Sequence, residues 1–173
     1  MDFSKFRTSD WLMVGGGAAM LILGFVLPWT TVSFAGISDS GDGPFDYFFP
    51  GGIAWLLIVA VGVLALLGAI GNLPDTQPWP LILLGLSGLG TLLMLIQILM
   101  GPRFDQPGFS RGIGMWLAVV WAVIATVGAV MSFQAGGGTM KDLTDMEKLK
   151  SSFGDKDRDG TPPPPPPPPP PAD

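Results

Sequence analysis

The chain has 173 residues, of which 48% are hydrophobic and 13% are charged, whereas about 25% of the residues in an average soluble domain are charged. The formal net charge of −5 is spread over the polar segments, which excludes the clustered basic face that nucleic-acid binding requires. Because the chain contains no Cys and no His, we expect no cofactor, no disulfide, no ordinary zinc or haem site, and no Ser-His or Cys-His catalytic pair.

The chain begins with a short polar lead, residues 1–10, and continues with a long apolar run. About 20 apolar residues are needed for a helix to cross a hydrocarbon core of ~30 Å, so we predict the first membrane span over residues 11–30. A secretory signal peptide cleaved at Ser33-Phe34-Ala35 is the alternative. We favour the span because the run is longer than the apolar core of a signal peptide.

The loop Pro28–Gly52 separates the first span from the second and contains no Lys or Arg. Within it, residues 29–34 predict a short strand or an extended end of the first span. Residues 38–44 predict a turn, and residues 45–49 predict one helical turn at the membrane surface. The candidate interaction residues of this loop are aromatic: Trp29, Phe34, Phe45, Tyr47, Phe48 and Phe49. Aromatic side chains at the headgroups ordinarily anchor a protein in lipid; a lateral or extracellular protein contact is the alternative, because aromatic residues dominate interface energetics.

Three further apolar segments predict spans over residues 53–71, 80–100 and 113–133, each bounded by Gly or Pro. The connection 71–80 is so short that the spans on either side of it must be antiparallel neighbours. We therefore predict an all-α integral membrane protein, in which residues 11–133 form an antiparallel bundle of four transmembrane helices.

Lys and Arg are distributed unequally over the two sides of this arrangement. With the N-terminus inside, seven basic residues lie inside, and only Arg103 and Arg111 lie outside, in the loop 103–112. The inside residues are Lys5, Arg7, Lys141, Lys148, Lys150, Lys156 and Arg158. Because basic residues accumulate in cytoplasmic segments, we predict that both termini are cytoplasmic.

Small residues four positions apart mark the fourth span, in the sets Gly114/Ala118/Ala122 and Ala125/Ala129. This spacing lets helix backbones approach closely. We predict packing within the bundle, and self-association or docking to another membrane protein is the alternative.

Polar side chains are few inside the predicted spans, and Gln97 is the most polar of those well inside a span. We expect it to form an interhelical hydrogen bond. No ionisable residue lies in the predicted hydrocarbon region, which argues against a coupled transporter or pump.

After the fourth span, residues 134–154 predict a glycine-rich joint and a short amphipathic juxtamembrane helix over Thr139–Phe153. Residues 155–173 predict a disordered tail, charged at first and then dominated by Pro162–Pro171, which favours polyproline II. The prolines are either a spacer or a ligand for an aromatic groove of an unspecified partner.

The run Asp155–Gly160 matches the opening of a calcium-binding loop, in which alternating carboxylates converge on one ion. The position of the closing Glu is Pro166, however, and Lys156 and Arg158 weaken the negative field. We therefore predict a solvated linker and no metal site.

Three short motifs carry a resemblance: Leu27-Pro28-Trp29, Phe45-Asp46-Tyr47-Phe48-Phe49 and Ile53-Ala54-Trp55-Leu56-Leu57. Through them, residues 11–133 resemble a group of small four-span actinobacterial membrane proteins, which share a Leu-Pro-Trp exit from the first span and often a Pro-rich tail. The resemblance implies a bacterial plasma-membrane location. It implies no activity and no catalytic residue.

The sequence thus favours a non-enzymatic integral membrane protein of the cell envelope, a scaffold or accessory subunit that binds other membrane proteins. The lipid bilayer is its first partner. A small-solute channel or transporter subunit is the alternative function. An enzyme acting on lipid or envelope substrates is a third hypothesis, and it would have to use Asp39, Asp42 or Asp46.

Overall fold

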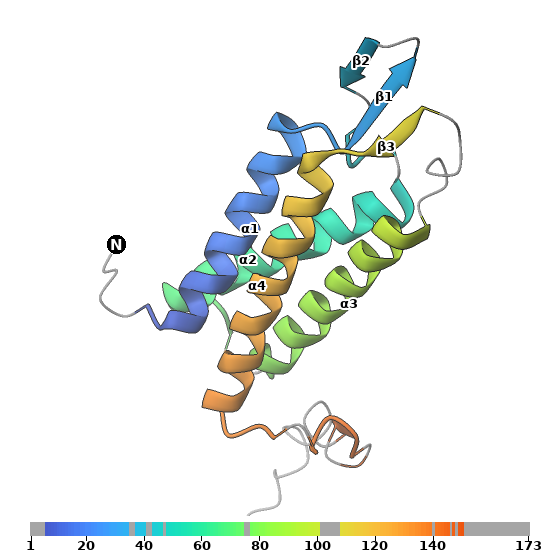
Figure 1. The fold of residues 1–173 in the computed structure, drawn as a ribbon. Coiled ribbons are helices and arrows are strands. Elements are labelled where there is room, and N and C mark those ends of the chain that lie inside the picture. Colours follow the sequence, from blue (N-terminus) through green and yellow to red (C-terminus); the bar gives the residue numbers. More distant parts are fainter. Residues whose placement is uncertain are drawn as a thin grey trace, which may run out of the picture.

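The computed structural model describes residues 6–34, 37–40, 43–46, 48–74, 77–100, 108–139, 141–145, 147 and 149–150. The described residues form four long helices (Figure 1): α1 (Thr8–Val26), α2 (Ile53–Ala69), α3 (Trp79–Met100) and α4 (Ile113–Ala135). Each helix, with α2 extended back to Phe49, is long and apolar enough to cross a membrane. The prediction of a mostly helical chain with four apolar helices is confirmed at this level, and it indicates a multi-pass membrane protein.

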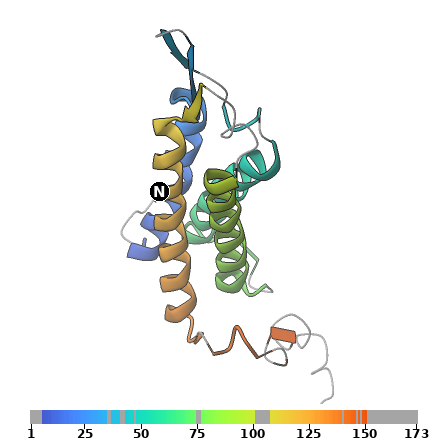
Figure 2. The same ribbon diagram turned by 45° about the vertical axis from the view of Figure 1, so that its right-hand side comes forward.

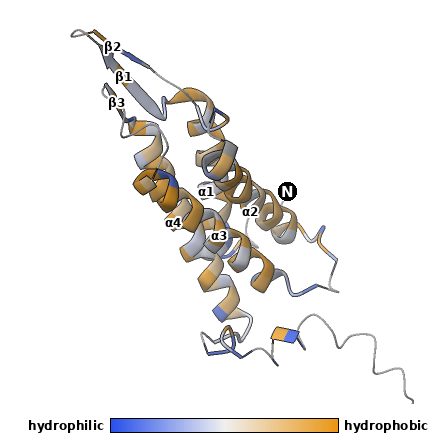
Figure 3. Ribbon diagram, turned by 90° about the vertical axis from the view of Figure 1, so that its right-hand side faces the viewer, coloured by the Kyte–Doolittle hydropathy of each residue, from blue (hydrophilic) through white to orange (hydrophobic). Residues whose placement is uncertain are grey.

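The helices pack around a shared interior. α1 packs against α2 and α4, and α3 packs against the same two helices. Apolar residues cover the outward faces as well, and large exposed side chains such as Leu21, Val63 and Leu92 point away from the core. The colours of Figure 3 show apolar residues along the helices and hydrophilic residues mainly near their ends. A helix that is apolar all round is what a lipid environment favours.

Glycine allows two helix pairs to approach closely. At the contact of α1 with α2, a Cβ added to Gly17 would lie 2.6 Å from the Cα of Gly62. At the contact of α1 with α4, a Cβ on Gly16 would lie 2.8 Å from the Cβ of Ala125. Small residues let helix backbones come together, so that dispersion contacts and not water exclusion hold the pair in lipid.

The first helix is displaced from the predicted span 11–30, because α1 begins at Thr8 and ends at Val26. Leu27 has φ −112° and ψ 139°, as expected for a residue before proline, where the α conformation is disfavoured. The chain then continues as strand β1 (Thr30–Phe34). Of the two predictions for residues 29–34, the strand is therefore the one observed.

Both outer loops contribute to one antiparallel sheet, with the strand order β2-β1-β3. Strand β2 (Ile37–Ser40) pairs with β1 so that Ser33 lies opposite Ser38, and β3 (Phe109–Arg111) pairs so that Thr31 lies opposite Ser110. The prediction of a turn over residues 38–44 is wrong for its first three residues, which belong to β2. Their Ser-Asp-Ser composition resembles a turn, but pairing with β1 outweighs this local preference.

The chain enters α2 through a turn at residues 44–46 and a short π-helical turn, η2 (Phe48–Gly52). Phe49 lies in η2 with an extended backbone (φ −117°, ψ 128°), and the Phe49–Pro50 peptide bond is cis. The predicted single helical turn over residues 45–49 is therefore not observed.

Two glycines with positive φ follow the helices at the opposite end of the molecule. Gly71 (φ +76°) follows α2, and Gly137 (φ +85°) follows α4. Gly is the residue that adopts this conformation without steric cost, and it commonly ends helices.

The described part of the Thr139–Phe153 segment has turns at residues 141–144 and helical backbone at residues 147 and 149–150, so it does not confirm one amphipathic helix over the whole segment. Asp142 accepts hydrogen bonds of 2.8 Å from both the backbone N–H and the hydroxyl of Thr139. The tail 155–173, with Asp155–Gly160 and the proline run, lies outside the described residues.

Candidate functional site

The end of the molecule where the sheet lies, which the sequence predicts to be the outer end, is held together by backbone contacts between the two residues before β1 and the start of α4. The N–H of Gly112 donates to the carbonyl of Trp29 at 2.8 Å, and the N–H of Gly114 donates to Pro28 at 3.1 Å. A Cβ on Gly112 would collide with the carbonyl oxygen of Pro28. Position 112 therefore requires glycine. The two hydrogen bonds hold the residues that follow α1 against the start of α4.

Trp29, predicted to lie on the interaction surface, is completely buried. It belongs to the same apolar cluster as Met20 and Met115. The prediction of an exposed Trp29 is wrong, because the chain turns inward after Pro28 and passes under the start of α4. Trp29 supports the outer end and offers no surface to a partner.

The other aromatic candidates are placed unequally. Phe45 is 47% exposed and Phe49 is 69% exposed. The side chains of Phe34 and Phe48, and the whole of Tyr47, lie outside the described residues.

Phe25, Phe45 and Trp55 form an outer aromatic cluster, with ring centroids 5.0 to 6.0 Å apart. The indole N–H of Trp55 donates to the carbonyl of Met20 at 2.8 Å, so its polar atom is satisfied inside the molecule. Phe25 is 71% exposed. The cluster lies beside the last turn of α1 and the first turn of α2.

The β1–β2 hairpin projects beyond the ends of the helices, as both views show (Figures 1 and 2). Hydroxyl groups line one face of the sheet: Ser33 bonds Ser38 at 2.8 Å, and Thr31 bonds Ser110 at 2.7 Å. Ile37, at the start of β2, is 75% exposed. Ile37 is therefore not part of the apolar core.

The register shows which backbone groups β2 offers at its open edge. The N–H of Ser33 donates to the carbonyl of Gly108 at 2.7 Å, on the side away from β2. In an antiparallel ladder, residue pairs alternate between hydrogen-bonded and non-hydrogen-bonded. The Ser33–Ser38 pair is therefore non-hydrogen-bonded, and the N–H and C=O of Ser38 point away from the sheet. Such an edge is a template for another strand.

The small-residue stripe of α4 lies inside the molecule. All five of its members are buried: Gly114, Ala118, Ala122, Ala125 and Ala129. Gly114 lies against the carbonyl oxygens at the end of α1, and Ala125 lies against Gly16. Since these contacts are internal, the stripe is not a free surface for a second copy of the chain.

Polar side chains meet at the contact of α3 with α4. The hydroxyls of Thr91 and Thr126 are 2.8 Å apart, and Thr126 also donates to the carbonyl of Ser87 at 3.1 Å. Gln97 lies in the same helix as Thr91 and is completely buried, yet no described residue forms a hydrogen bond with either atom of its amide. The predicted interhelical hydrogen bond of Gln97 is thus not observed, and the threonines form the polar contact instead.

Arg111, one of the two arginines predicted outside, contacts the end of a helix. Its Nε donates to the carbonyl of Ile98 at 2.6 Å. The last carbonyls of a helix have no partner within it and carry partial negative charge, so a cation there is stabilising. A structural role thus accounts for this basic residue on the outer side.

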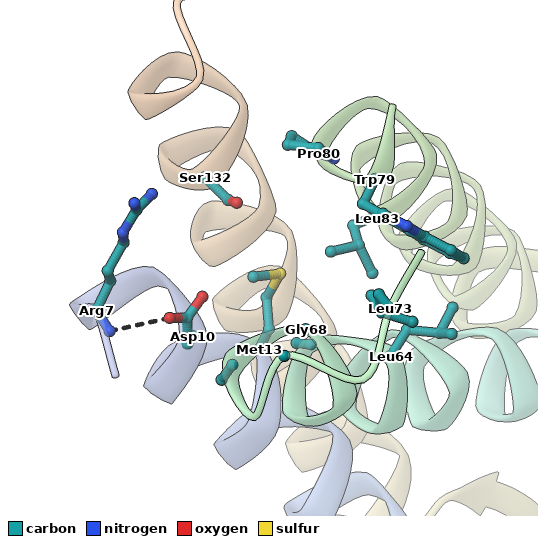
Figure 4. A pocket seen from close by; sticks show the side chains of 13 residues that line it. Arg7, Asp10, Met13, Leu64, Gly68, Leu73, Trp79, Pro80, Leu83 and Ser132 are labelled. Carbon is teal, nitrogen blue, oxygen red and sulfur yellow. Dashed lines mark hydrogen bonds between the residues drawn. The ribbon is translucent and has the colours of Figure 1, made fainter. Parts of the chain in front are cut away.

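A pocket of about 540 Å³ lies at the end of the helices opposite the sheet (Figure 4). The ends of all four helices and the turn after α2 line it: Arg7, Asp10, Met13, Leu64, Ala65, Gly68, Ala69, Gly71, Leu73, Trp79, Pro80, Leu83 and Ser132. We refer to it as the inner-end pocket. Its volume lies in the range of small-molecule sites, which is roughly 300–1,000 Å³.

Acidic residues do not gather into a metal site in the described part of the chain. Asp46 accepts a 2.8 Å bond from the N–H of Gly43, and Asp39 lies on β2 opposite Val32. Asp42 lies outside the described residues. Of the carboxylates in the enzymatic hypothesis, the described Asp39 and Asp46 lie in different elements, β2 and the turn at residues 44–46.

Comparison of the chain with protein-family models gave no match, and comparisons with curated proteins and with solved structures gave none either.

Proposed function

We propose that this chain is a non-enzymatic integral protein of the bacterial plasma membrane, and that it binds another envelope membrane protein through the open edge of β2. In this proposal the four helices cross the bilayer as an antiparallel bundle with both termini in the cytoplasm. The sheet then faces outward, and the inner-end pocket faces inward.

The charge distribution supports this orientation. Arg7 precedes α1, and most of the other basic residues follow α4 in the sequence. Those that the structure describes there, Lys141 and Lys150, lie beyond the end of α4 that is opposite the sheet. Basic residues accumulate on the cytoplasmic side. Of the two basic residues left outside, Arg111 is bonded to the end of α3.

The observation that carries the proposal is the open edge of β2 beside the exposed Ile37. The hairpin extends beyond the helix ends, so lipid cannot cover Ile37 as it can cover Phe25 or Phe49. Proteins ordinarily protect sheet edges with charge, proline or a covering element. β2 has one charged residue, Asp39, whose backbone pairs with β1, whereas the neighbouring Ser38 directs its backbone groups away from β1. An edge that exposes an N–H, a C=O and an apolar side chain favours strand addition by a partner.

The interior argues against the small-solute channel. Met20, Ile58 and Met94 are completely buried between the helices and belong to one apolar cluster. These side chains fill the centre of the molecule between the inner-end pocket and the sheet. For this reason we do not propose that the chain is a small-solute channel.

Photo-crosslinking in cells tests the proposal. With a benzophenone amino acid in place of Ile37, we expect adducts with one reproducible protein, identified by mass spectrometry. The same group in place of Ile22, 59% exposed on α1, serves as a control that should give lipid adducts.

The variant Ser38→Pro tests whether the outward N–H of Ser38 is needed for binding of the partner. Proline removes the outward N–H of Ser38 but no bond to β1, and edge strands tolerate it for that reason. We expect the Ile37 adduct to fall roughly tenfold in Ser38→Pro, by loss of a hydrogen bond and the associated strand contacts. Ser38→Ala keeps the N–H and loses the same hydroxyl, so its yield should stay at the wild-type level. Equal yields in both variants, or lipid adducts alone, would overturn the proposal.

A further inference from the structure

The inner-end pocket has an apolar floor. Met13 of α1, Ala65 of α2 and Leu83 of α3 are all buried, and they belong to one apolar cluster. Opposite walls come from Leu64 and Leu73 on one side and from α4 on the other (Figure 4). A cavity surrounded by such side chains is complementary to a hydrocarbon chain.

The rim of the pocket is polar, and its groups lie mainly on one side. Arg7, Asp10 and Ser132 lie together, across the pocket from Trp79 and Pro80 (Figure 4). Asp10 accepts a 2.9 Å hydrogen bond from the backbone N–H of Arg7. The guanidinium of Arg7 takes no part in this hydrogen bond. A guanidinium presents several N–H donors in a planar fork that matches phosphate geometry.

Trp79 marks the depth of this rim relative to the membrane. Its indole N–H donates to the carbonyl of Pro74 at 2.8 Å, which holds the ring at the start of α3. Trp at the end of a spanning helix lies at the headgroup level. The polar rim and the headgroups of the inner leaflet are therefore at the same depth, and the apolar floor is at the depth of the first acyl carbons.

We infer that the inner-end pocket binds one phospholipid of the inner leaflet, with its phosphate at Arg7 and part of an acyl chain against Met13, Ala65 and Leu83. A phospholipid has an anionic phosphate, which the guanidinium of Arg7 can bind, directly beside a hydrocarbon chain, which the apolar floor can cover. It is also the amphiphile present at the highest concentration at this depth. The inference depends on the proposed placement of the helices in a bilayer, but not on the proposed protein partner.

Native mass spectrometry of the full-length chain in detergent micelles, titrated with phosphatidylglycerol, tests this inference. We expect one bound lipid per chain in the wild type. Ser132→Leu places an apolar side chain into the pocket, and Arg7→Gln removes the cation. Each variant should bind the lipid roughly tenfold more weakly, which is the effect of losing one charge-assisted hydrogen bond or a comparable contact area.

Two matched controls share the same end of the molecule. Gln134→Leu makes a similar apolar change on an exposed residue of α4 that does not line the pocket, and Lys141→Gln removes an exposed cation. Both should bind phosphatidylglycerol as the wild type does. Circular dichroism of each variant checks that helix content is unchanged. The rise in Tm that the lipid causes is a second readout of binding, because a ligand stabilises the folded state that binds it.

Two further probes separate the sources of the phosphate contact. Inorganic phosphate alone should not bind at concentrations where the lipid does, and an uncharged diacylglycerol should bind as weakly as the lipid binds to Arg7→Gln. Equal binding of phosphatidylglycerol to the wild type and Ser132→Leu would overturn the inference. So would equal binding of diacylglycerol and phosphatidylglycerol, or binding of inorganic phosphate as tight as that of the lipid. These outcomes leave the Ile37 crosslinking result untouched.

Discussion

Gln97 is buried without a hydrogen-bond partner among the described residues. Its amide lies close to Gly51, where an added Cβ would be 3.5 Å from the Cδ of Gln97 and 3.7 Å from the ring of Trp29. A buried polar group without a partner costs about 1–3 kcal/mol, whereas an apolar group of the same shape removes that cost. Gln97 therefore weakens the outer end of the molecule unless another group binds it.

Replacement of Gln97 by Met, which has a similar length and no amide, tests this cost. We expect Gln97→Met to raise the free energy of unfolding by about 1 kcal/mol, measured by thermal or denaturant unfolding in detergent. Gln134→Met, on an exposed residue of α4, is the control and should leave stability unchanged. A clear loss of stability in Gln97→Met would mean that the amide is bonded to a group outside the described residues.

Exposure of single residues was the least predictable property of this chain. Trp29 was expected at the surface because it follows an apolar run, as headgroup aromatics do, yet it is buried. Its burial depends on Gly112, which lies 83 residues later in the chain. Because this glycine has no side chain, the start of α4 can approach the backbone of Trp29 closely. By contrast, the spacing of Gly114 and Ala118 on one helix face indicates a packing surface, and both residues are buried.

At the scale of elements, the contact between α1 and α2 depends on two glycines. A Cβ on Gly17 would lie 2.6 Å from Gly62, a distance at which backbone has to move. Gly15 lies two residues earlier, on the opposite face of the same helix, and a Cβ there would meet nothing within 4 Å. The two positions therefore offer a matched pair.

We expect Gly17→Ala to destabilise the protein by about 1–3 kcal/mol, the usual cost of overpacking a tight contact. Gly15→Ala should leave stability unchanged or raise it by up to about 1 kcal/mol, because alanine favours the helix. Thermal unfolding of both variants in the same detergent measures the difference. Equal stability of the two variants would contradict the close helix contact.

The four long helices were predictable, and the strands only partly so. An apolar run of about 20 residues determines a helix in lipid, because every backbone group must be satisfied within the segment. Strand β1 has a visible preference, but β2 and β3 are short and polar. They exist because Thr31 pairs with Ser40 on one side and with Ser110 on the other. Pairing across 79 positions is not visible in local sequence.

At the scale of the whole molecule, the proposed orientation is open to a direct test, because the chain contains no Cys. Single replacements Ser40→Cys and Ser151→Cys place a thiol on the proposed outer side and in the proposed cytoplasmic segment. In intact cells, a membrane-impermeant thiol reagent should label the first variant and label the second only after permeabilisation. Labelling of Ser151→Cys alone in intact cells would reverse the orientation, and the wild type provides an unlabelled control.

Composition predicts the environment of the chain but neither the inner-end pocket nor the open edge of β2. The apolar content predicts that the chain lies in a membrane, and the distribution of Lys and Arg predicts which segments lie on each side of it. The inner-end pocket is lined by residues as far apart in the sequence as Arg7 and Ser132. The open edge of β2 depends on the pairing of β1 with β2 on one side and with β3 on the other. Both features arise from contacts between distant segments, for which the sequence contains no local pattern.

The pairing of β1 with β3 also sets an order of assembly. Ribosomes deliver the chain from the N-terminus, so in the proposed orientation β1 and β2 leave the membrane well before Phe109–Arg111 has been translated. Until α4 is inserted, β1 has one strand neighbour and Trp29 lacks the backbone of Gly112 that covers it. A chain that stops after three helices therefore lacks a completed outer sheet. In the proposed orientation, the insertion of α4 is therefore the step that allows β3 to pair with β1, and the proposed partner would bind chains in which all four helices have been inserted.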